Sequence, residues 1–400
     1  MNRARHGAIA AALVLALAGA GTAFAAPQPA NTTQPANTAP SAPLSSESKG
    51  VQLQLPRPTG PYAVGRGTLH LVDTSRRDPW VPMAGARELM VSMYYPARRG
   101  TGAAAPYMTR EGARLFLESR ELDGVVPAEV LSGTRTHSFS GARPAPGRFP
   151  LVVLSPGFSV PRTTISALAE DLTSRGYVVA TVDHAYEAVG VAFPGGRTLP
   201  CAACGRAEEV GLDSVAKGRA RDLSFVLDQL TGRHPAWRHA GMIDQRRIGM
   251  AGHSMGGMST AATMAADTRV RAGVNMDGPF GTAPPGAGLG GRAFMMLGTE
   301  ADHSPGGEDA TWDRAWRRLD GWKRWLTVAG SGHFAFTDLP VLGAQLGLND
   351  SSEPLPGQRA GEITRDYVGA FFDLHLRGIA QPLLNGPSAA NPEVTPHNGS

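Results

Sequence analysis

The sequence predicts an α/β fold in which a mostly parallel central sheet is covered by helices on both faces. Two observations carry this prediction. Short β-rich runs alternate with helical patterns through most of the chain, and such alternation is typical of parallel sheets built from strand–helix–strand units. Two of these runs, residues 150–154 and 177–182, are continuous and β-rich, as expected of strands that are buried on both faces of a sheet.

The predicted elements follow one another in a regular order. Between the two apolar runs, Ile165, Leu168 and Leu172 recur at helical spacing, and Gly176 ends that helix. Three further helices are expected, two of them from amphipathic patterns, and the strands are expected from their apolar, β-branched composition. The complete set comprises strands at 68–72, 88–95, 150–154, 177–182, 247–251, 272–276, 293–297 and 325–328, and helices at 164–175, 214–230, 259–266 and 362–376.

Both ends of the chain differ in composition from this middle part. Arg3 and Arg5 precede a weakly apolar run that ends in an Ala-Phe-Ala pattern at 23–25, which predicts a secretory signal peptide over residues 1–25 and a secreted, extracellular protein. Residues 26–50 are rich in Pro, Thr and Ala and predict a disordered linker. The catalytic domain is expected over residues 51–378, and a flexible tail over 379–400.

Charge and cysteine content narrow the classes of function. The 38 Lys and Arg residues leave a net charge of +4 but are scattered, and without a basic patch we do not expect nucleic-acid binding. Once the signal peptide is removed, no run is long and apolar enough to predict an integral membrane segment. The two cysteines, Cys201 and Cys204, are expected to form a small disulfide in an oxidising compartment.

The sharpest local motif is Gly252-His-Ser-Met-Gly256, which lies between a predicted strand and a predicted helix. In that context a G-x-S-x-G sequence predicts a nucleophile elbow, a tight turn that presents the serine at the carboxyl edge of the sheet of an α/β-hydrolase fold. Glycines two residues before and after the serine are required because side chains there would collide with the neighbouring backbone. Ser254 is therefore the predicted nucleophile.

A serine hydroxyl needs a base, and the base needs an acid that orients it. In this fold the chain order is serine, acid, histidine, and His333, in a Gly-rich turn after the strand at 325–328, is the predicted base. His303 follows a strand too closely to serve. Two acids fit the order: Asp277 ends the strand at 272–276, and Asp302 follows the strand at 293–297. Spacing alone leaves both open.

Acyl transfer also requires backbone N–H donors that stabilise the oxyanion. Met255 is expected to supply one of them, because it follows the nucleophile. The second is expected from the loop Ser155-Pro-Gly-Phe-Ser159 after the strand at 150–154. Pro156 has no N–H, whereas Gly157 allows close approach and Phe158 can donate.

Several stretches together resemble the platelet-activating factor acetylhydrolase family of secreted lipid esterases, over nearly all of residues 51–378. The matching stretches lie at 58–65, 91–96, 149–157, 182–184, 252–257, 276–278 and 330–333. The resemblance implies Asp277 rather than Asp302 as the acid, because this family places its acid one strand earlier than usual, and it implies Phe158 and Met255 as the oxyanion donors. The Pro156-Gly157 pair stands where the family usually has His-Gly, and this loop with the elbow also resembles actinobacterial cutinase-like lipases.

The predicted function is therefore that of a secreted serine carboxylic-ester hydrolase acting on lipid esters. Ser254 forms the acyl-enzyme, with His333 as the base and Asp277 as the acid. The resemblance implies a phospholipid with a short sn-2 acyl chain as substrate. A cutinase-like hydrolase of polyesters or short triglycerides is the alternative, and a non-catalytic hydrolase-like binding protein is a remote one. The expected partners are a small ester or lipid and a transient lipid interface. The mechanism requires no metal or organic cofactor.

Overall fold

The computed structural model describes residues 50–397. The predicted signal peptide lies outside these residues, as does the predicted linker apart from Gly50. Within the described residues the main sheet has eleven strands in the order β13-β12-β11-β10-β9-β5-β6-β2-β1-β4-β3. A separate two-stranded sheet pairs β7 (Val191–Phe193) with β8 (Arg197–Leu199).

The centre of the main sheet is parallel, as predicted. Each neighbouring pair from β6 through β12 is parallel. The strands of this part are β5 (Phe149–Ser155), β6 (Val178–His184), β9 (Ile243–His253), β10 (Val270–Met276), β11 (Ala293–Thr299) and β12 (Lys323–Val328). Antiparallel pairs continue the sheet at both sides. At one side, β2 (Ala86–Ala97) pairs with β6 and with β1 (Ala63–Arg77), and the short β4 (Ser138–Ser140) and β3 (Ala103–Ala104) follow β1. At the other side, β13 (Val394–His397) pairs with β12.

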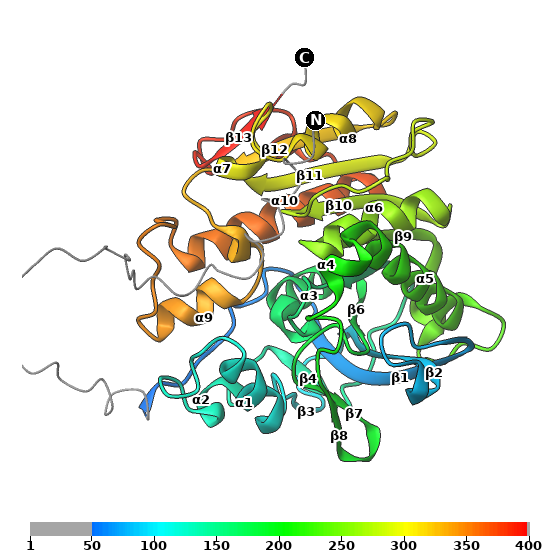
Figure 1. The fold of residues 1–400 in the computed structure, drawn as a ribbon, viewed down its shortest axis with the longest axis vertical. Coiled ribbons are helices and arrows are strands. Elements are labelled where there is room, and N and C mark those ends of the chain that lie inside the picture. The colour runs from blue at the N-terminus through cyan, green and yellow to red at the C-terminus, as the bar shows by residue number, and fades with distance from the viewer. Residues whose placement is uncertain (1–49, 398–400) are drawn as a thin grey trace, which may run out of the picture.

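Helices cover both faces of this sheet (Figure 1). Successive residues of β5 point to opposite faces: Leu151 and Val153 belong to one apolar cluster, and Val152 and Leu154 to the other. The first cluster packs against α5 (Leu212–Thr231), α6 (Met255–Ala266) and α8 (Ala310–Arg318), and the second against α3 (Ser166–Ser174) and α10 (Gly357–Arg377). The continuous apolar runs of the sequence reflect burial on both sides.

The remaining helices lie at the edges of this layered core. A third apolar cluster joins α1 (Arg110–Glu118) and α2 (Ala128–Ser132) to α9 (Leu339–Gln345), three helices that the sequence pattern did not reveal. The first two of these helices and α9 are far apart in the chain but lie near one another in the fold, as Figure 1 shows. Two short helices, α4 (Ala207–Val210) and α7 (Glu300–His303), precede α5 and α8.

The prediction of a flexible tail over 379–400 is wrong for its described part. After α10 the chain folds back, and β13 pairs antiparallel with β12. Leu384 and Val394 are buried in the cluster on the α10 face of the sheet. A segment this poor in apolar residues orders because two of them reach an existing core and because an open strand edge offers backbone partners.

Within residues 50–397, none of the helices combines the length and the apolar composition needed to cross a bilayer.

Candidate active site

Ser254 lies between β9 and α6, in a left-handed conformation with φ 54° and ψ −122°. A Cβ atom on Gly252 would lie 2.1 Å from the carbonyl carbon of Gly256, and one on Gly256 would lie 1.9 Å from the carbonyl oxygen of Ser155. Both positions therefore require glycine. The sequence between β9 and α6 thus forms the sharp turn that the motif predicts, at the carboxyl ends of the parallel strands.

The side chain of Asp277, the residue after β10, reaches His333. Its Oδ2 atom accepts a hydrogen bond from Nδ1 of His333 over 2.6 Å. Asp277 is 1% exposed; burial alone would raise the pKa of its carboxyl, yet His303 and His333 hold that pKa well below its usual range. Asp277 is thus a buried carboxylate that stays ionised and orients an imidazole.

Asp302 occupies a different place. Its side chain is exposed and accepts a hydrogen bond from the hydroxyl of Thr299 over 3.2 Å. Of the two acids that the chain order left open, Asp277 is the one in contact with His333.

His303, which sequence reasoning set aside, contacts the same carboxylate. Its Nδ1 atom lies 2.7 Å from Oδ1 of Asp277, so that this carboxylate binds two imidazole rings. The only hint in the sequence was the Asp302-His303 pair directly after a strand, where a polar side chain at the carboxyl edge points toward the site.

His253, beside the nucleophile, holds the loop of the base. Its Nε2 atom donates to the carbonyl oxygen of His333 over 2.7 Å, and the two rings lie 4.7 Å apart. Burial and the neighbouring His333 lower the pKa of His253 to about 3, so that this ring is neutral. Within residues 50–397 the side chain of Ser254 makes no capping hydrogen bond at the start of α6. A hydrogen bond between a nucleophile and its base often forms or tightens only when substrate binds.

The predicted oxyanion donors lie on the loop after β5 and at the start of α6. Met255 is the first residue of α6, where a backbone N–H has no partner within the helix. The N–H of Phe158 has no acceptor among the described residues. Ser159 follows with φ 65°, and its N–H donates to the carbonyl oxygen of Glu187. This hydrogen bond holds the loop at Ser159 and leaves the N–H of Phe158 available to an oxyanion.

Arg219 of α5 supports the same loop from below. Its guanidinium donates to the carbonyl oxygen of Pro156 over 2.6 Å and binds Glu187 over 2.7 Å. Glu187 also binds Arg87, which in turn pairs with Asp222. Arg87 is 1% exposed, as is Arg219, so the backbone of the loop rests on a buried network of charges.

Two cavities adjoin these elements. One, of about 460 Å³, is mainly apolar and lies between α1, α2, α9 and the loop after His333. Phe334 and Arg120 line it; Phe334 follows His333 in sequence, and Arg120 donates a hydrogen bond to the hydroxyl of Ser159. The cavity is therefore close to both the predicted base and the predicted oxyanion loop.

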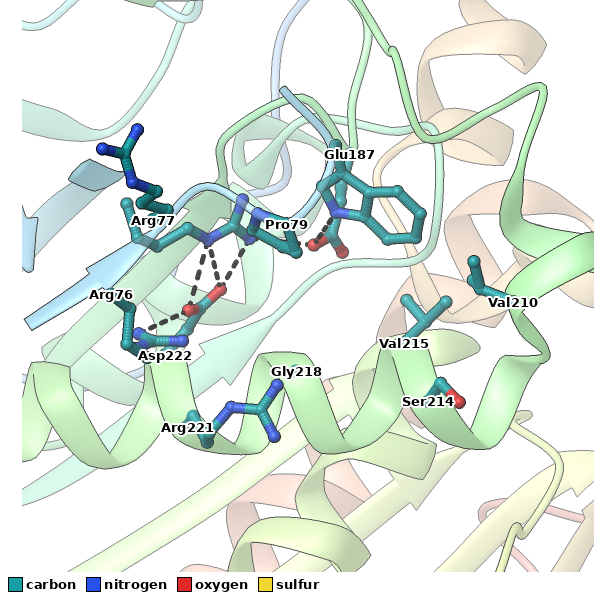
Figure 2. A pocket seen from close by; sticks show the side chains of 12 residues that line it. Arg76, Arg77, Pro79, Glu187, Val210, Ser214, Val215, Gly218, Arg221 and Asp222 are labelled. Carbon is teal, nitrogen blue, oxygen red and sulfur yellow. Dashed lines mark hydrogen bonds and ion pairs between the residues drawn. The ribbon is translucent and has the colours of Figure 1, made fainter. Parts of the chain in front are cut away.

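The second cavity, of about 490 Å³, lies between the β1–β2 connection and α5. Figure 2 shows Arg76 paired with Asp222 in its wall, and Arg221 and Ser214 facing it from α5. It borders the charge network that supports the oxyanion loop.

The two cysteines are joined in the structure. Cys201 and Cys204 form a disulfide within the connection between β8 and α4. The loop is anchored nearby, since the N–H of Ala203 donates to the carbonyl oxygen of Tyr186. Ala202 and Ala203, between the two cysteines, belong to the same apolar cluster as Met255 and Phe158.

Comparisons with known proteins show what the chain as a whole is similar to. Residues 47–193 match the family model of platelet-activating factor acetylhydrolase, isoform II. Over 377 residues the chain is 29% identical to a probable 1-alkyl-2-acetylglycerophosphocholine esterase of Arthroderma benhamiae, a match that spans 85% of this chain and 92% of that protein. It is 25% identical to a platelet-activating factor acetylhydrolase of Bos taurus, over 56% of this chain and 55% of that protein.

A solved structure gives the highest identity among these. A ferulic acid esterase from Streptomyces cinnamoneus is 46% identical, with a TM-score of 0.78, and the match covers 86% of this chain and 99% of that one. The α/β-hydrolase fold predicted from the elbow is thereby confirmed. The chain is an ester hydrolase that is similar to the platelet-activating factor acetylhydrolase family over residues 47–193 and to a ferulic acid esterase over most of its length.

Proposed function

We propose that this protein is a secreted serine hydrolase that cleaves lipid esters with a short acyl chain, in particular phospholipids acylated at sn-2, through an acyl-enzyme on Ser254. One observation carries the proposal. Ser254 is held in a strained turn at the carboxyl edge of the sheet, and the carboxylate that follows the adjacent strand orients His333. These are the parts that acyl transfer by a serine requires.

In the proposed mechanism, His333 takes the proton of Ser254 as the hydroxyl attacks the ester carbonyl. The oxyanion that forms is stabilised by the N–H groups of Phe158 and Met255, and Asp277 stabilises the imidazolium of His333. His333 then protonates the leaving alcohol. A water molecule, deprotonated by the same imidazole, attacks the acyl-enzyme and releases the acid and the free serine.

The apolar cavity supports an ester that carries one apolar group. Its walls are mainly Leu, Phe and Pro side chains, with Arg120 and Glu353 at polar positions. Burying a hydrocarbon segment there contributes about 0.8 kcal/mol per methylene. The volume of about 460 Å³ is in the usual range of pockets that bind small ligands.

A labelling experiment tests the chemistry. An organophosphonate probe is expected to label the wild-type protein on Ser254 and to leave Ser254→Ala unlabelled. Ser259→Ala serves as the control and is expected to label normally, because Ser259 is a buried serine of α6 whose hydroxyl donates to a backbone carbonyl. Circular dichroism checks that both variants fold. Labelling of a folded Ser254→Ala variant would contradict the proposal.

A second candidate function is hydrolysis of polyesters, as in cutinase-like enzymes, or of esters of aromatic acids. The similarity to a ferulic acid esterase over 99% of that chain favours it. A substrate panel separates the two: an acetylated phospholipid, tributyrin, methyl ferulate and p-nitrophenyl esters of increasing chain length. We expect the highest kcat/KM for the phospholipid and the shortest acyl chains. A preference for methyl ferulate over the phospholipid would support the second candidate instead.

Secretion is part of the same proposal and rests on the first 25 residues of the sequence. The protein recovered from the culture medium is expected to begin at Ala26. Amino-terminal sequencing of that protein tests this, and a secreted form that keeps Met1 would contradict a cleaved signal peptide.

A further inference from the structure

The carboxylate of Asp277 is shared between two imidazole rings. Oδ2 binds Nδ1 of His333 over 2.6 Å, and Oδ1 binds Nδ1 of His303 over 2.7 Å. The backbone N–H of Thr299 also donates to Oδ1 over 2.7 Å. Triad chemistry needs only one of these rings as a base, so the role of His303 requires a separate explanation.

Both nitrogens of His303 face carboxylates. Opposite the contact with Asp277, its Nε2 atom lies 3.4 Å from Oδ2 of Asp309, the residue that caps the N-terminus of α8. A neutral imidazole has one N–H and one lone pair. In this position the lone pair of a neutral ring would face a carboxylate oxygen, whereas a protonated ring donates to both carboxylates.

The surroundings favour the same protonation state. The ring stacks on the indole of Trp312, with centroids 4.2 Å apart and planes 27° from parallel, and an indole face attracts a cation. Trp325 donates from its indole N–H to the carbonyl oxygen of His303 over 2.7 Å, which holds the backbone in place. His303 is 6% exposed, so water does not provide alternative partners.

We propose that His303 is a positioning residue for this reaction, an imidazole that stays protonated at neutral pH, orients Asp277 toward His333 and offsets part of its negative charge. The proposal rests on the proposed function of Ser254, His333 and Asp277. It assigns to Asp309 the task of keeping His303 charged. The alternating charges of Asp309, His303, Asp277 and the imidazolium of His333 then balance during catalysis.

The charged groups around His303 are those that this assignment requires. Asp277 after β10 and Asp309 before α8 face the ring directly. On its own helix, Glu300 and Asp302 are exposed. Burial alone would lower the pKa of His303, but Asp277 and Asp309 outweigh it and raise that pKa to about 9, which agrees with the geometry.

The charge of His303 has a measurable consequence for the base. A cation on one side of Asp277 disfavours a second proton on the ring at its other side, so that removing the cation makes His333 easier to protonate. In His303→Gln a neutral side chain can still donate to Asp277. We expect the acid limb of the kcat/KM profile to move to higher pH by about one unit, as for charges a few Å apart in a partly screened site.

Glu308→Gln is the matched control, since Glu308 is an exposed acidic neighbour of Asp309, and it is expected to keep the wild-type profile. A merely structural role of His303 would lower activity at all pH values without moving the acid limb. An unmoved acid limb in folded His303→Gln would therefore overturn the proposal.

Nuclear magnetic resonance of the histidine side chains in the wild-type protein gives a test that does not depend on how His303→Gln folds. In the wild-type protein one imidazole is expected to carry protons on both nitrogens at about pH 8, where ordinary histidines are neutral. In Asp309→Asn that signal is expected to lose its second proton at lower pH. If no histidine is doubly protonated at that pH, the proposal is wrong.

Failure of the proposed function is distinguishable from failure of this inference. If Asp277→Asn retains wild-type turnover, Asp277 is not the acid and the proposed function itself is wrong. If Asp277→Asn is inactive while the His303→Gln profile is unchanged, only the role of His303 is wrong.

Discussion

Ser159, Ser254 and Asp277 share a left-handed backbone that residues other than glycine rarely adopt. Their φ angles are 65°, 54° and 59°. Each is held by a backbone hydrogen bond from its own N–H: Ser159 to Glu187, Ser254 to Met276 and Asp277 to Leu297. Strained residues of this kind persist only where surrounding structure determines them, and they gather at functional sites. Five residues other than glycine have such φ angles within residues 50–397. Two of them, Ser254 and Asp277, belong to the proposed chemistry, and Ser159 follows the proposed oxyanion donor Phe158.

Substitution of the acid is the prediction that belongs to this scale. Asp277→Asn is expected to lower kcat by about 10³- to 10⁴-fold, because an amide no longer stabilises the imidazolium or selects its tautomer. Asp302→Asn, which removes an exposed carboxylate that contacts Thr299, is expected to change kcat less than about threefold, as surface substitutions usually do. Steady-state kinetics on a p-nitrophenyl ester measures both. A larger loss in Asp302→Asn than in Asp277→Asn would exclude Asp277 as the acid.

Helix α5 connects the site to a buried network of charges. It carries Arg219, which binds the carbonyl oxygen of Pro156 in the oxyanion loop, and Asp222, which binds Arg87 and His184. The hydroxyl of Ser155 in turn lies 3.1 Å from Nε2 of His184. Two residues of one helix, about one turn apart, thus hold the start of the loop through the carbonyl oxygen of Pro156 and the hydroxyl of Ser155. Precise placement of oxyanion donors contributes a large share of catalysis by serine hydrolases.

Removal of this support is expected to affect turnover and stability together. Arg219→Met leaves Glu187 without one of its two arginine partners and should destabilise the fold by about 3 kcal/mol, the usual effect of breaking a buried ion pair. We expect kcat to fall about tenfold to a hundredfold, as when an oxyanion donor is displaced.

Arg221→Met, an exposed arginine on the same helix, is the control and should alter neither quantity. Urea unfolding and steady-state kinetics measure the two effects. An Arg219→Met variant with wild-type kcat would show that the loop does not depend on this contact.

At the scale of the whole molecule, the C-terminal segment supplies an edge strand of the main sheet. β13 pairs with β12, the strand that leads to the His333 loop. Arg359 of α10 pairs with Glu393 over 2.8 Å and so joins this segment to the helix layer. The end of the chain therefore closes the sheet edge next to the loop that carries the proposed base.

Truncation tests this arrangement. A chain that ends at Gly378 loses β13 and the buried side chains of Leu384 and Val394, which contribute about 3 to 6 kcal/mol together if each is worth about 1.5 to 3 kcal/mol. Its Tm should fall by several degrees, as about 2 to 4 °C per kcal/mol is usual for large domains. A chain that ends at His397 is the control and should keep the wild-type Tm. An unchanged Tm after removal of residues 379–400 would restore the prediction of an unstructured tail.

Local patterns accounted for most of the fold. The alternation of apolar runs and helical patterns predicted all six parallel strands at the centre of the sheet, and the elbow predicted the fold class. Helices α1, α2 and α9 escaped prediction because their apolar faces pack on one another across more than 200 residues of chain. The apolar residues of each helix are explained only by the other helices against which they pack.

By itself, the sequence determined the order of the strands along the chain, the turn at Ser254 and the two candidate acids, Asp277 and Asp302, for His333. Those features depend on near neighbours in the chain, such as the glycines that a tight turn requires. Only the tertiary structure decided that Asp277 rather than Asp302 contacts His333, that His303 shares this carboxylate and that Arg219 supports the oxyanion loop. These contacts join side chains of different strands and helices, and their distances are set by how the layers pack rather than by any spacing along the chain.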